Sequence, residues 1–428
     1  MKNYKSLLLL FLFVITISTA AHAQQVFVAN LSGAQEVPAV TSPGRGVCRV
    51  ILNPAQTQIS VNCNYSGLSS AANAAHIHGN APVGANAPVL FNFGAISGTS
   101  GTITNQTFTL TPQQVADLRQ NRMYVNVHTA NNPGGEIRGQ LHVANAIFDD
   151  YDGDGRTDVT VFRPSNGTWY SLLSLNNAPK AQQWGLSTDI TPLNSDFDGD
   201  GISDYAMIRP NATDGNLTTF FLYSATNTFQ AVPFGNAALG DTVAAGDYDG
   251  DGKYDIAVFR RGLWVYIEST TGAVRYFNFG QQGDSPVRGS DFDRDGKADF
   301  NVVRNVGGQL VWYILQSSNN QLRTVPFGLF GDTIVSRNDF DGDGASDITV
   351  TRSNGGNRDF YTLQSSDGQV KYFRWGFTSD ALGIGDFDGD GKSDYTVYRN
   401  QNNSLFWYIF QSTNNQLRAF PWGAGGDL

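Results

Sequence analysis

One acidic motif, Asp-x-Asp-x-Asp-Gly-x-x-Asp, occurs six times in the C-terminal two thirds of the chain. The copies begin at Asp150, Asp196, Asp247, Asp291, Asp339 and Asp386, at intervals of 46, 51, 44, 48 and 47 residues. A nearly constant period of this size is typical of repeat architectures, in which each unit is too small to bury its own apolar faces and must stack on its neighbours. The motif therefore predicts six similar units packed side by side.

The spacing within the motif predicts a calcium-binding loop. Carboxylates at positions 1, 3 and 5 converge on one point, and glycine at position 6 permits a sharp turn. The backbone carbonyl at position 7 and the carboxylate at position 9 complete an oxygen cage, as in the first part of an EF-hand loop that lacks the glutamate at position 12. We predict about six Ca²⁺ ions per chain. The predicted ligands are Asp150, Asp152, Asp154, Arg156 and Asp158; Asp196, Asp198, Asp200, Ile202 and Asp204; Asp247, Asp249, Asp251, Lys253 and Asp255; Asp291, Asp293, Asp295, Lys297 and Asp299; Asp339, Asp341, Asp343, Ala345 and Asp347; and Asp386, Asp388, Asp390, Lys392 and Asp394.

The charge balance agrees with bound cations. The 38 acidic side chains exceed the 28 basic ones by ten, and loss of Lys2 and Lys5 with a signal peptide raises the excess to twelve. The motifs contribute 24 aspartates, and six divalent cations would offset the excess. The acidity therefore needs no basic partner, and nothing in the sequence suggests nucleic-acid binding.

The residues between the motifs follow one plan. A short apolar strand after each motif ends in arginine, an aromatic strand follows, and a third strand ends in an aromatic residue and glycine. Four short strands in about 47 residues predict the blade of a β-propeller. Six motifs favour six blades, although seven remain an alternative. We expect the six arginines to pair with aspartates of neighbouring blades; a role in binding anionic ligands is the alternative. They are Arg163, Arg209, Arg260, Arg304, Arg352 and Arg399.

The aromatic-Gly element and the Asp-rich loop resemble FG-GAP and VCBS repeats, the blades of integrin α-subunit propellers. The resemblance covers about 280 residues and implies Ca²⁺ at the first, third, fifth and ninth motif positions. Motif four departs from the pattern, because Arg294 replaces the glycine at position 4. A backbone that requires a positive φ angle there would disfavour arginine and weaken that site.

The chain is predicted to consist of a signal peptide at 1–23, a separate domain at 24–144 and the propeller at 145–428. Lys2 and Lys5 precede an apolar run that is too short to span a bilayer, and Ala21-His22-Ala23 has the form of a cleavage site. We expect a secreted, cell-surface or periplasmic protein. Alternating strands in 24–144 predict a β-sandwich, and 111–118 predicts one short helix capped by Thr111.

Both cysteines of the chain lie in this domain. If 47–52 and 59–63 form a hairpin, Cys48 faces Cys63, while Val50 faces Val61 on the same side. An exported protein with this register is expected to form the Cys48–Cys63 disulfide. Two buried free thiols are the alternative.

Three histidines form a possible second metal site. Alternation places His76 and His78 on one face of a strand, and His128 on the polar face of another. Together they could bind Cu or Zn. The alternative is that they only form hydrogen bonds with nearby backbone.

Four segments of this domain resemble the CHRD domain, named for chordin: LSGAQEVP at 31–38, AHIHG at 75–79, NVHT at 126–129 and GGEIRG at 134–139. The resemblance covers about 120 residues and implies little about function. The histidine pattern is also similar to the copper ligands of Cu/Zn superoxide dismutase. Residues 80–127 contain no histidine, however, so that enzyme's bridging and zinc ligands are missing.

No catalytic constellation is evident. The repeats contain neither histidine nor cysteine, and the clustered aspartates are accounted for by calcium. We predict a non-enzymatic adhesion or ligand-recognition protein whose propeller binds a protein or a glycan. The alternatives are a carbohydrate-active or copper-binding enzyme and a purely structural surface protein.

Overall fold

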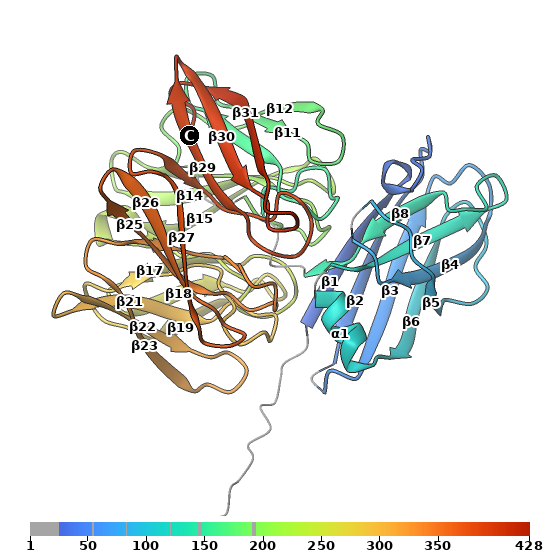
Figure 1. Ribbon diagram of the computed structural model, residues 1–428, viewed down its shortest axis with the longest axis horizontal. Coiled ribbons are helices and arrows are strands. Elements are labelled where there is room, and N and C mark those ends of the chain that lie inside the picture. Colours follow the sequence, from blue (N-terminus) through green and yellow to red (C-terminus); the bar gives the residue numbers. More distant parts are fainter. Residues whose placement is uncertain (1–24, 54, 83, 120, 144–147, 191–193) are drawn as a thin grey trace, which may run out of the picture.

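The computed structural model shows an all-β protein with two units, an N-terminal β domain and a β-propeller (Figure 1). It describes residues 25–53, 55–82, 84–119, 121–143, 148–190 and 194–428. The predicted signal peptide lies outside these residues. Within the described ranges, no helix is long and apolar enough to cross a membrane.

The N-terminal domain is one curled antiparallel sheet of nine strands, in which the two predicted layers are continuous. The order is β5-β4-β7-β8-β1-β2-β3-β6, with β9 paired to β1. Phe91 on one edge strand stacks on Phe108 of the other at 4.8 Å, so the sheet is nearly closed. The elements are β1 (Gln25–Ser32), η1 (Gly33–Gln35), β2 (Arg45–Leu52), β3 (Gln58–Ser66), β4 (Ala72–Gly79), β5 (Val89–Asn92), β6 (Gly101–Thr109), α1 (Pro112–Arg119), β7 (Met123–Thr129), β8 (Ile137–Gln140) and β9 (His142–Val143).

Two local predictions in this domain are confirmed. Cys48 lies opposite Cys63 in the β2–β3 pair and forms the disulfide. The predicted helix is α1, where the backbone N–H of Gln114 donates to the Thr111 hydroxyl at 3.2 Å. The Gln114 side chain accepts from the N–H of Thr111 at 2.8 Å, which completes a reciprocal cap.

The propeller has six blades. Four blades are four-stranded sheets; in the first two blades three strands form the sheet, and an innermost strand is reduced to a short backbone pairing. The strands are β10 (Val159–Arg163), β11 (Thr168–Leu172) and β12 (Pro179–Gln183); β13 (Tyr205–Pro210), β14 (Asn216–Leu222) and β15 (Phe229–Asn236); β16 (Thr242–Val243), β17 (Ile256–Arg260), β18 (Leu263–Ile267) and β19 (Val274–Asn278); β20 (Ser285–Pro286), β21 (Phe300–Val306), β22 (Gln309–Leu315) and β23 (Leu322–Leu329); β24 (Thr333–Val335), β25 (Ile348–Asn354), β26 (Asn357–Leu363) and β27 (Val370–Phe377); and β28 (Ala381–Gly383), β29 (Tyr395–Gln401), β30 (Ser404–Phe410) and β31 (Leu417–Ala424), with a 3-10 helix η2 (Ala237–Leu239) after β15.

The end of the chain closes the ring. Leu428 and Phe162 of β10 exchange two backbone hydrogen bonds of 2.8 Å, so the C-terminal residue occupies the innermost position of the first blade. Ile190 pairs with Ile208 in the corresponding position of the second blade. The sequence also predicts that residues 144–148 supply the first strand of the first blade, but residues 144–147 lie outside the described residues.

The recurring aromatic residues pack within and between blades. Trp169, Trp264 and Trp312 are fully buried. Each indole N–H donates to the carbonyl of the aromatic residue before the Gly of the third strand, at 2.9–3.0 Å. This bond ties the aromatic strand to the aromatic-Gly element, and satisfies the polar atom of a residue that otherwise serves as core.

Arginine–aspartate pairs are present in all six blades, but the partner is not the aspartate of a neighbouring blade that the sequence predicted. Each arginine at the end of a blade strand pairs with an aspartate from the connection that leads into that blade, at 2.5–2.8 Å. In the first blade the partner of Arg163 is Asp427 from the end of the chain, so this pair also joins the first and last repeats. The six pairs are Arg163–Asp427, Arg209–Asp189, Arg260–Asp241, Arg304–Asp284, Arg352–Asp332 and Arg399–Asp380.

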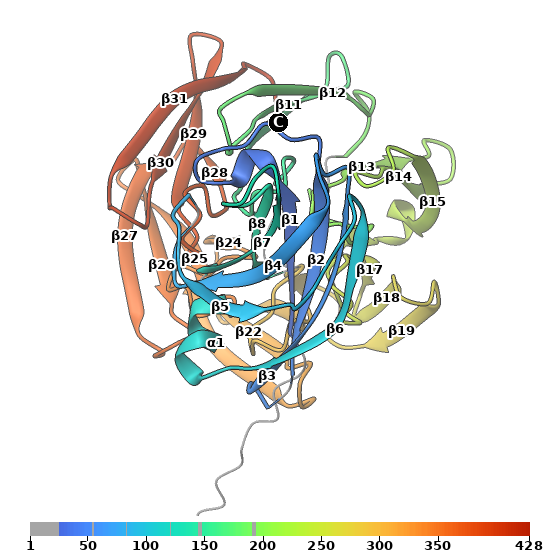
Figure 2. The same cartoon turned by 90° about the vertical axis from the view of Figure 1, so that its right-hand side faces the viewer.

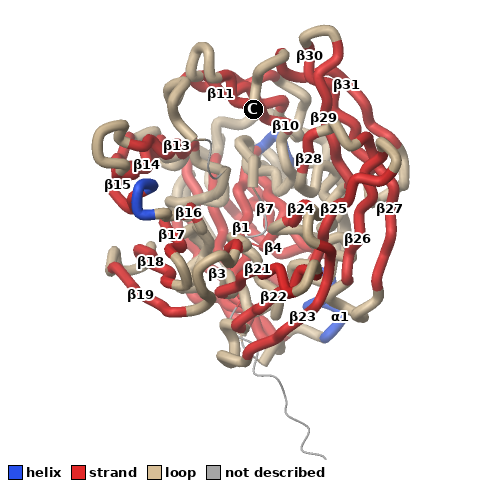
Figure 3. The backbone as a smooth tube through the Cα atoms, turned by 90° about the vertical axis from the view of Figure 1, so that its left-hand side faces the viewer, coloured by secondary structure: helices blue, strands red, loops and turns tan. Residues whose placement is uncertain are grey.

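The propeller has two distinct faces. The Asp motifs precede the strand that ends in arginine, so the motifs lie on one face and the Arg–Asp pairs on the other. We call these the Asp-loop face and the free face. The N-terminal domain lies against the Asp-loop face (Figures 1 and 2). Arg49 donates to the carbonyl of Asp251, and Gln35 donates to that of Gly153 at 3.4 Å. The opposite face of the propeller is turned to the viewer in Figure 3.

Candidate functional site

Each Asp loop folds around its first carboxylate. In loop one, Asp150 accepts the backbone N–H groups of Gly153 at 2.6 Å and Gly155 at 2.9 Å. Asp158 at position 9 accepts the N–H of Tyr151 at 2.8 Å. These bonds direct the acidic side chains to one place: oxygens of Asp150, Asp152 and Asp158 lie within 4.8 Å of one another.

Carboxylates converge in the other loops as well. In loop two, carboxylate oxygens at positions 1, 3 and 9 also lie within 4.8 Å of one another. In loops three and four, this is true of the oxygens at positions 1, 3 and 5. Two further groups of at least three His, Cys, Asp or Glu side chains with this spacing occur among the described residues. At position 7, each backbone N–H donates to the carboxylate at position 5, at 2.8–2.9 Å. The role of the position 7 carbonyls as ligands stays a prediction.

The loops hold buried negative charge. Burial, reinforced by the neighbouring carboxylates, raises the pKa of the aspartate at position 1 well above its usual value in all six loops. For the same reasons the pKa at position 9 is raised to about 8 in Asp158 and to about 7 in Asp204 and Asp255. A cation among these oxygens would favour the ionised form and reverse the effect.

A serine anchors every loop, which the sequence analysis missed. Ser269, in the turn after β18, donates its backbone N–H to Asp255 at 2.7 Å and its hydroxyl to Asp251 at 2.9 Å. The next residue, Thr270, donates its N–H to Asp249 at 3.1 Å. A serine at this point of every repeat was the available signal, but its distance from the motif varies. The equivalent serines are Ser174, Ser224, Ser317, Ser365 and Ser412.

The six loops are joined head to tail in a ring. The backbone N–H at position 8 of each loop donates to the carbonyl of the aspartate at position 1 of the preceding loop, at 2.5–2.8 Å. The ring closes because Thr157 of loop one donates to Asp386 of loop six at 2.7 Å. A change in one loop therefore acts directly on the backbone of its neighbour.

Loops one and four differ from the other loops because each contains an arginine side chain that pairs with a carboxylate. Arg156 in loop one forms an ion pair with the position 5 carboxylate of Asp154. Arg294 in loop four has φ +65°, so this position does require a left-handed backbone, as expected. The Arg294 side chain reaches loop five and lies 3.1 Å from a carboxylate oxygen of Asp343.

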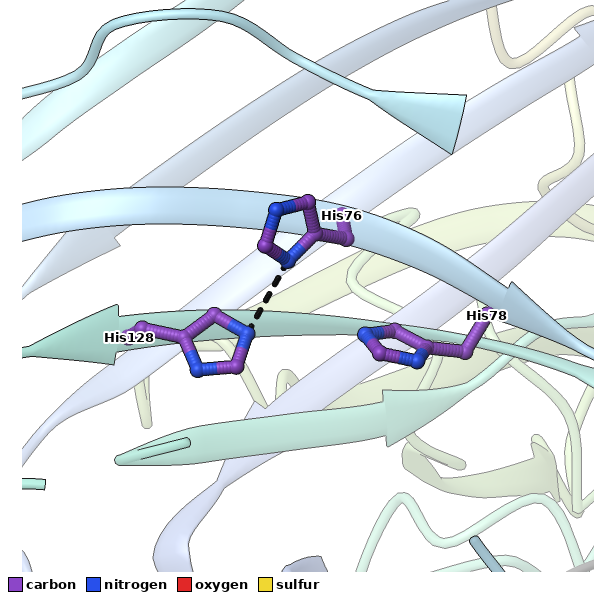
Figure 4. A group of neighbouring side chains, drawn as sticks. All are labelled: His76, His78 and His128. Atoms are coloured by element: carbon purple, nitrogen blue, oxygen red, sulfur yellow. Dashed lines mark hydrogen bonds between the residues drawn. The ribbon is translucent and has the colours of Figure 1, made fainter. Parts of the chain in front are cut away.

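The predicted histidine cluster is assembled by the pairing of β4 and β7. Ala74 lies opposite His128 and His76 lies opposite Asn126, which places all three histidines on one face of the sheet. His76 Nδ1 lies 3.0 Å from His128 Nε2, and one ring nitrogen from each histidine falls within a 4.8 Å group (Figure 4).

Family models match both parts of the chain. Residues 27–141 match the CHRD domain, and residues 196–258 match the FG-GAP-like repeat. The protein therefore carries a CHRD domain, followed by a six-bladed propeller with an FG-GAP-like repeat. The disulfide and the FG-GAP-like repeat agree with an extracellular location.

No curated protein matches the chain in sequence. Similar solved structures include a nidogen/laminin complex, with 12% identity and a TM-score of 0.27, covering 48% of this chain and 90% of that one. A protein from Lactobacillus plantarum has 10% identity and a TM-score of 0.32, covering 71% and 92%. The K499G mutant of NanB sialidase from Streptococcus pneumoniae has 11% identity and a TM-score of 0.25, covering 95% and 68%. These TM-scores are too low for the likenesses to bear on function.

Proposed function

We propose that this is an exported, calcium-binding, non-enzymatic recognition protein. In this proposal Ca²⁺ in the six Asp loops stabilises the propeller, and the free face of the propeller binds a protein ligand. The observation that carries it is the location of the CHRD domain against the Asp-loop face, which leaves the opposite face available.

The chemistry of the loops supports calcium. Hard divalent cations prefer carboxylate and carbonyl oxygens, and Ca²⁺ accepts six to eight of them in irregular geometry. The loops offer several carboxylates each, and burial together with mutual repulsion makes their ionised forms costly without a cation. The hydrogen-bonded ring would transmit the ordering of each loop to the next.

Exposed apolar side chains support a protein ligand on the free face. Phe330 is 71% exposed and Phe377 is 50% exposed. Both follow an aromatic-Gly element, and Phe377 donates its N–H to Asp380, the partner of Arg399 on the free face. Exposed apolar side chains that recur after the aromatic-Gly elements of several blades favour contact with a protein. The other members of the set are Leu186, Leu239 and Leu329.

The calcium part is tested by counting metal ions in the purified mature chain by mass spectrometry. About six Ca²⁺ per chain, removed by chelator together with a fall in melting temperature, is the expected result. A chain that contains no Ca²⁺ and melts at the same temperature in chelator would refute this part.

The recognition part is tested with an array of purified extracellular matrix proteins and glycans. We expect binding to a protein that is lost in the double variant Leu329→Ser, Phe330→Ser. Tyr276→Ser is the matched control, because Tyr276 is also 71% exposed but lies on the outer strand β19. Equal loss in both variants, or binding to glycans alone, would contradict a protein-binding free face.

A further inference from the structure

The histidine cluster of the CHRD domain has the arrangement of a transition-metal site, with ligand atoms and supporting contacts in place. His76 and His78 come from β4 and His128 from β7, and the three rings lie close together, edge-on or tilted to one another (Figure 4). Their centroids are 4.9 Å apart for His76 and His128, and 5.6 Å apart for His76 and His78. All three rings therefore surround one small volume.

Backbone carbonyls determine which nitrogen is available on two of the histidines. His78 Nδ1 lies 2.9 Å from the carbonyl oxygen of Ala87, and His128 Nδ1 lies 2.9 Å from that of Pro133. A carbonyl oxygen only accepts hydrogen bonds, so each Nδ1 carries the proton and each Nε2 keeps its lone pair, which on His128 accepts the hydrogen bond from His76 Nδ1. This is the contact by which metal-binding histidines are normally oriented.

The free lone pair of His78 is buried and unused. His78 is only 8% exposed, and its Nε2 atom has no hydrogen-bond partner. On the same face, the buried side chain of Asn126 lies against His78. Leaving buried acceptors unpaired is costly, and a bound cation would satisfy the nitrogen.

The ring of His78 is also held in place. It stacks on Tyr124 at 4.7 Å with an interplanar angle of 5°, and the guanidinium of Arg138 covers the Tyr124 ring at 3.5 Å.

We propose that His76 Nδ1, His78 Nε2 and His128 Nε2 bind one divalent late-transition-metal cation, with Cu²⁺ bound most tightly. Metal–imidazole bonds of about 2.0–2.1 Å require nitrogens roughly 3–3.5 Å apart, which the His76–His128 distance of 3.0 Å already approaches. The cation replaces the hydrogen bond between these two rings, and the proton on His76 Nδ1 moves to Nε2. Imidazole ligands suit copper and zinc, and Cu²⁺ is the strongest binder of the divalent series.

The site is open on one side, because His76 and His128 are only partly buried. A three-histidine set leaves a coordination position for water or an external ligand. The inference is independent of the Asp loops, whose oxygen ligands favour harder cations.

The first test uses the full mature chain, saturated with Ca²⁺ so that the Asp loops do not compete. One equivalent of Zn²⁺, which is diamagnetic, is added while the histidine ring nitrogens are followed by NMR. We expect shifts at His76, His78 and His128 and none at His142, which is buried outside the cluster and serves as an internal control. Unshifted cluster resonances would overturn the proposal without any mutation.

The second test measures Cu²⁺ binding by calorimetry and by electron paramagnetic resonance. The wild-type chain should bind one Cu²⁺ with nitrogen hyperfine structure. His76→Gln and His128→Gln should each weaken binding at least about tenfold, whereas Asn92→Ala on the neighbouring strand β5 should leave it unchanged. Equal affinity in the double histidine variant, or a spectrum with oxygen ligands only, would refute the site.

Discussion

The CHRD domain and the propeller are both built from antiparallel strands, but they obtain their stability differently. The CHRD domain encloses one continuous apolar core with residues from Phe27 to Val143, and a disulfide joins its strands β2 and β3. The propeller has small apolar clusters between neighbouring blades, such as Trp312 of the fourth blade with Ile348 and Val350 of the fifth. Its Asp-loop face is instead filled with buried carboxylates.

This difference predicts that one unit folds without metal and the other depends on it. Apolar burial stabilises a domain whatever ions are present. Buried carboxylates repel one another and destabilise the folded state unless a cation is bound. The CHRD domain is therefore expected to fold without metal, whereas the propeller face against which it lies is expected to depend on calcium.

Removal of Ca²⁺ by a chelator should have the largest effect, because it should destabilise the propeller and not the CHRD domain. Each site contributes about 2.7 kcal/mol when Ca²⁺ is present at a hundredfold excess over its Kd. Loss of six sites should lower the propeller transition by at least about 15 °C and leave the CHRD transition nearly unchanged. Differential scanning calorimetry with and without EGTA measures both, and a parallel fall of both transitions would show that the units melt as one.

The pH dependence of the metal-free chain should have the opposite sign to that of the calcium-bound chain. The pKa of Asp158 is raised to about 8 and that of Asp347 to about 7, so the folded state binds more protons than the unfolded state between about pH 4 and pH 8. Without metal, the free energy of unfolding should therefore fall as the pH rises through this range. With Ca²⁺ it should rise, because protons compete for the ligands.

Urea unfolding at pH 5 and pH 8, on protein freed of metal beforehand, measures this effect. The tryptophan fluorescence of the propeller reports the transition, since the described tryptophans all lie in the blades. A metal-free propeller that is more stable at pH 8 would contradict the assignment of the raised pKa values to these loops.

Removal of the disulfide should destabilise only the CHRD domain. Cys48 and Cys63 are separated by 15 residues, and a loop of this size corresponds to about 3 kcal/mol. The double variant Cys48→Ala, Cys63→Ala should lower the CHRD transition and leave the calcium content unchanged. Calorimetry with metal analysis tests both, and any loss of Ca²⁺ would reveal coupling between the units.

The smallest expected effect is at Arg294. Its φ of +65° is strained for a residue with a side chain, so Arg294→Gly should stabilise loop four by up to about 1 kcal/mol. Loss of the half-exposed ion pair with Asp343 offsets part of this gain. Gly250→Ala, at the same position of loop three, is the opposite control, because the φ of +80° at Gly250 is strained for alanine. Calcium titration of both variants tests these opposite effects: tighter binding is expected for Arg294→Gly and weaker binding for Gly250→Ala.

Much of the architecture could be predicted because it depends on short stretches of sequence. The motif period predicted the blades, and strand alternation predicted the pairing of Cys48 with Cys63. The positive φ at Arg294 followed from comparison of the six copies. Each of these features is set by local backbone geometry or by residues that pair across one turn.

Contacts between distant segments required the tertiary structure. The anchoring serine of each loop was missed because its separation from the motif depends on strand length. The closure through Leu428 and Phe162 was missed because backbone pairing has no side-chain signature.

The sequence by itself determined that this protein has a CHRD-like domain, six repeats and six acidic loops, since periodicity and spacing are properties of the chain. Only the tertiary structure decided that the CHRD domain covers the Asp-loop face and that the three histidines meet. The physical reason is that both depend on how surfaces distant in sequence pack together, which no local pattern encodes.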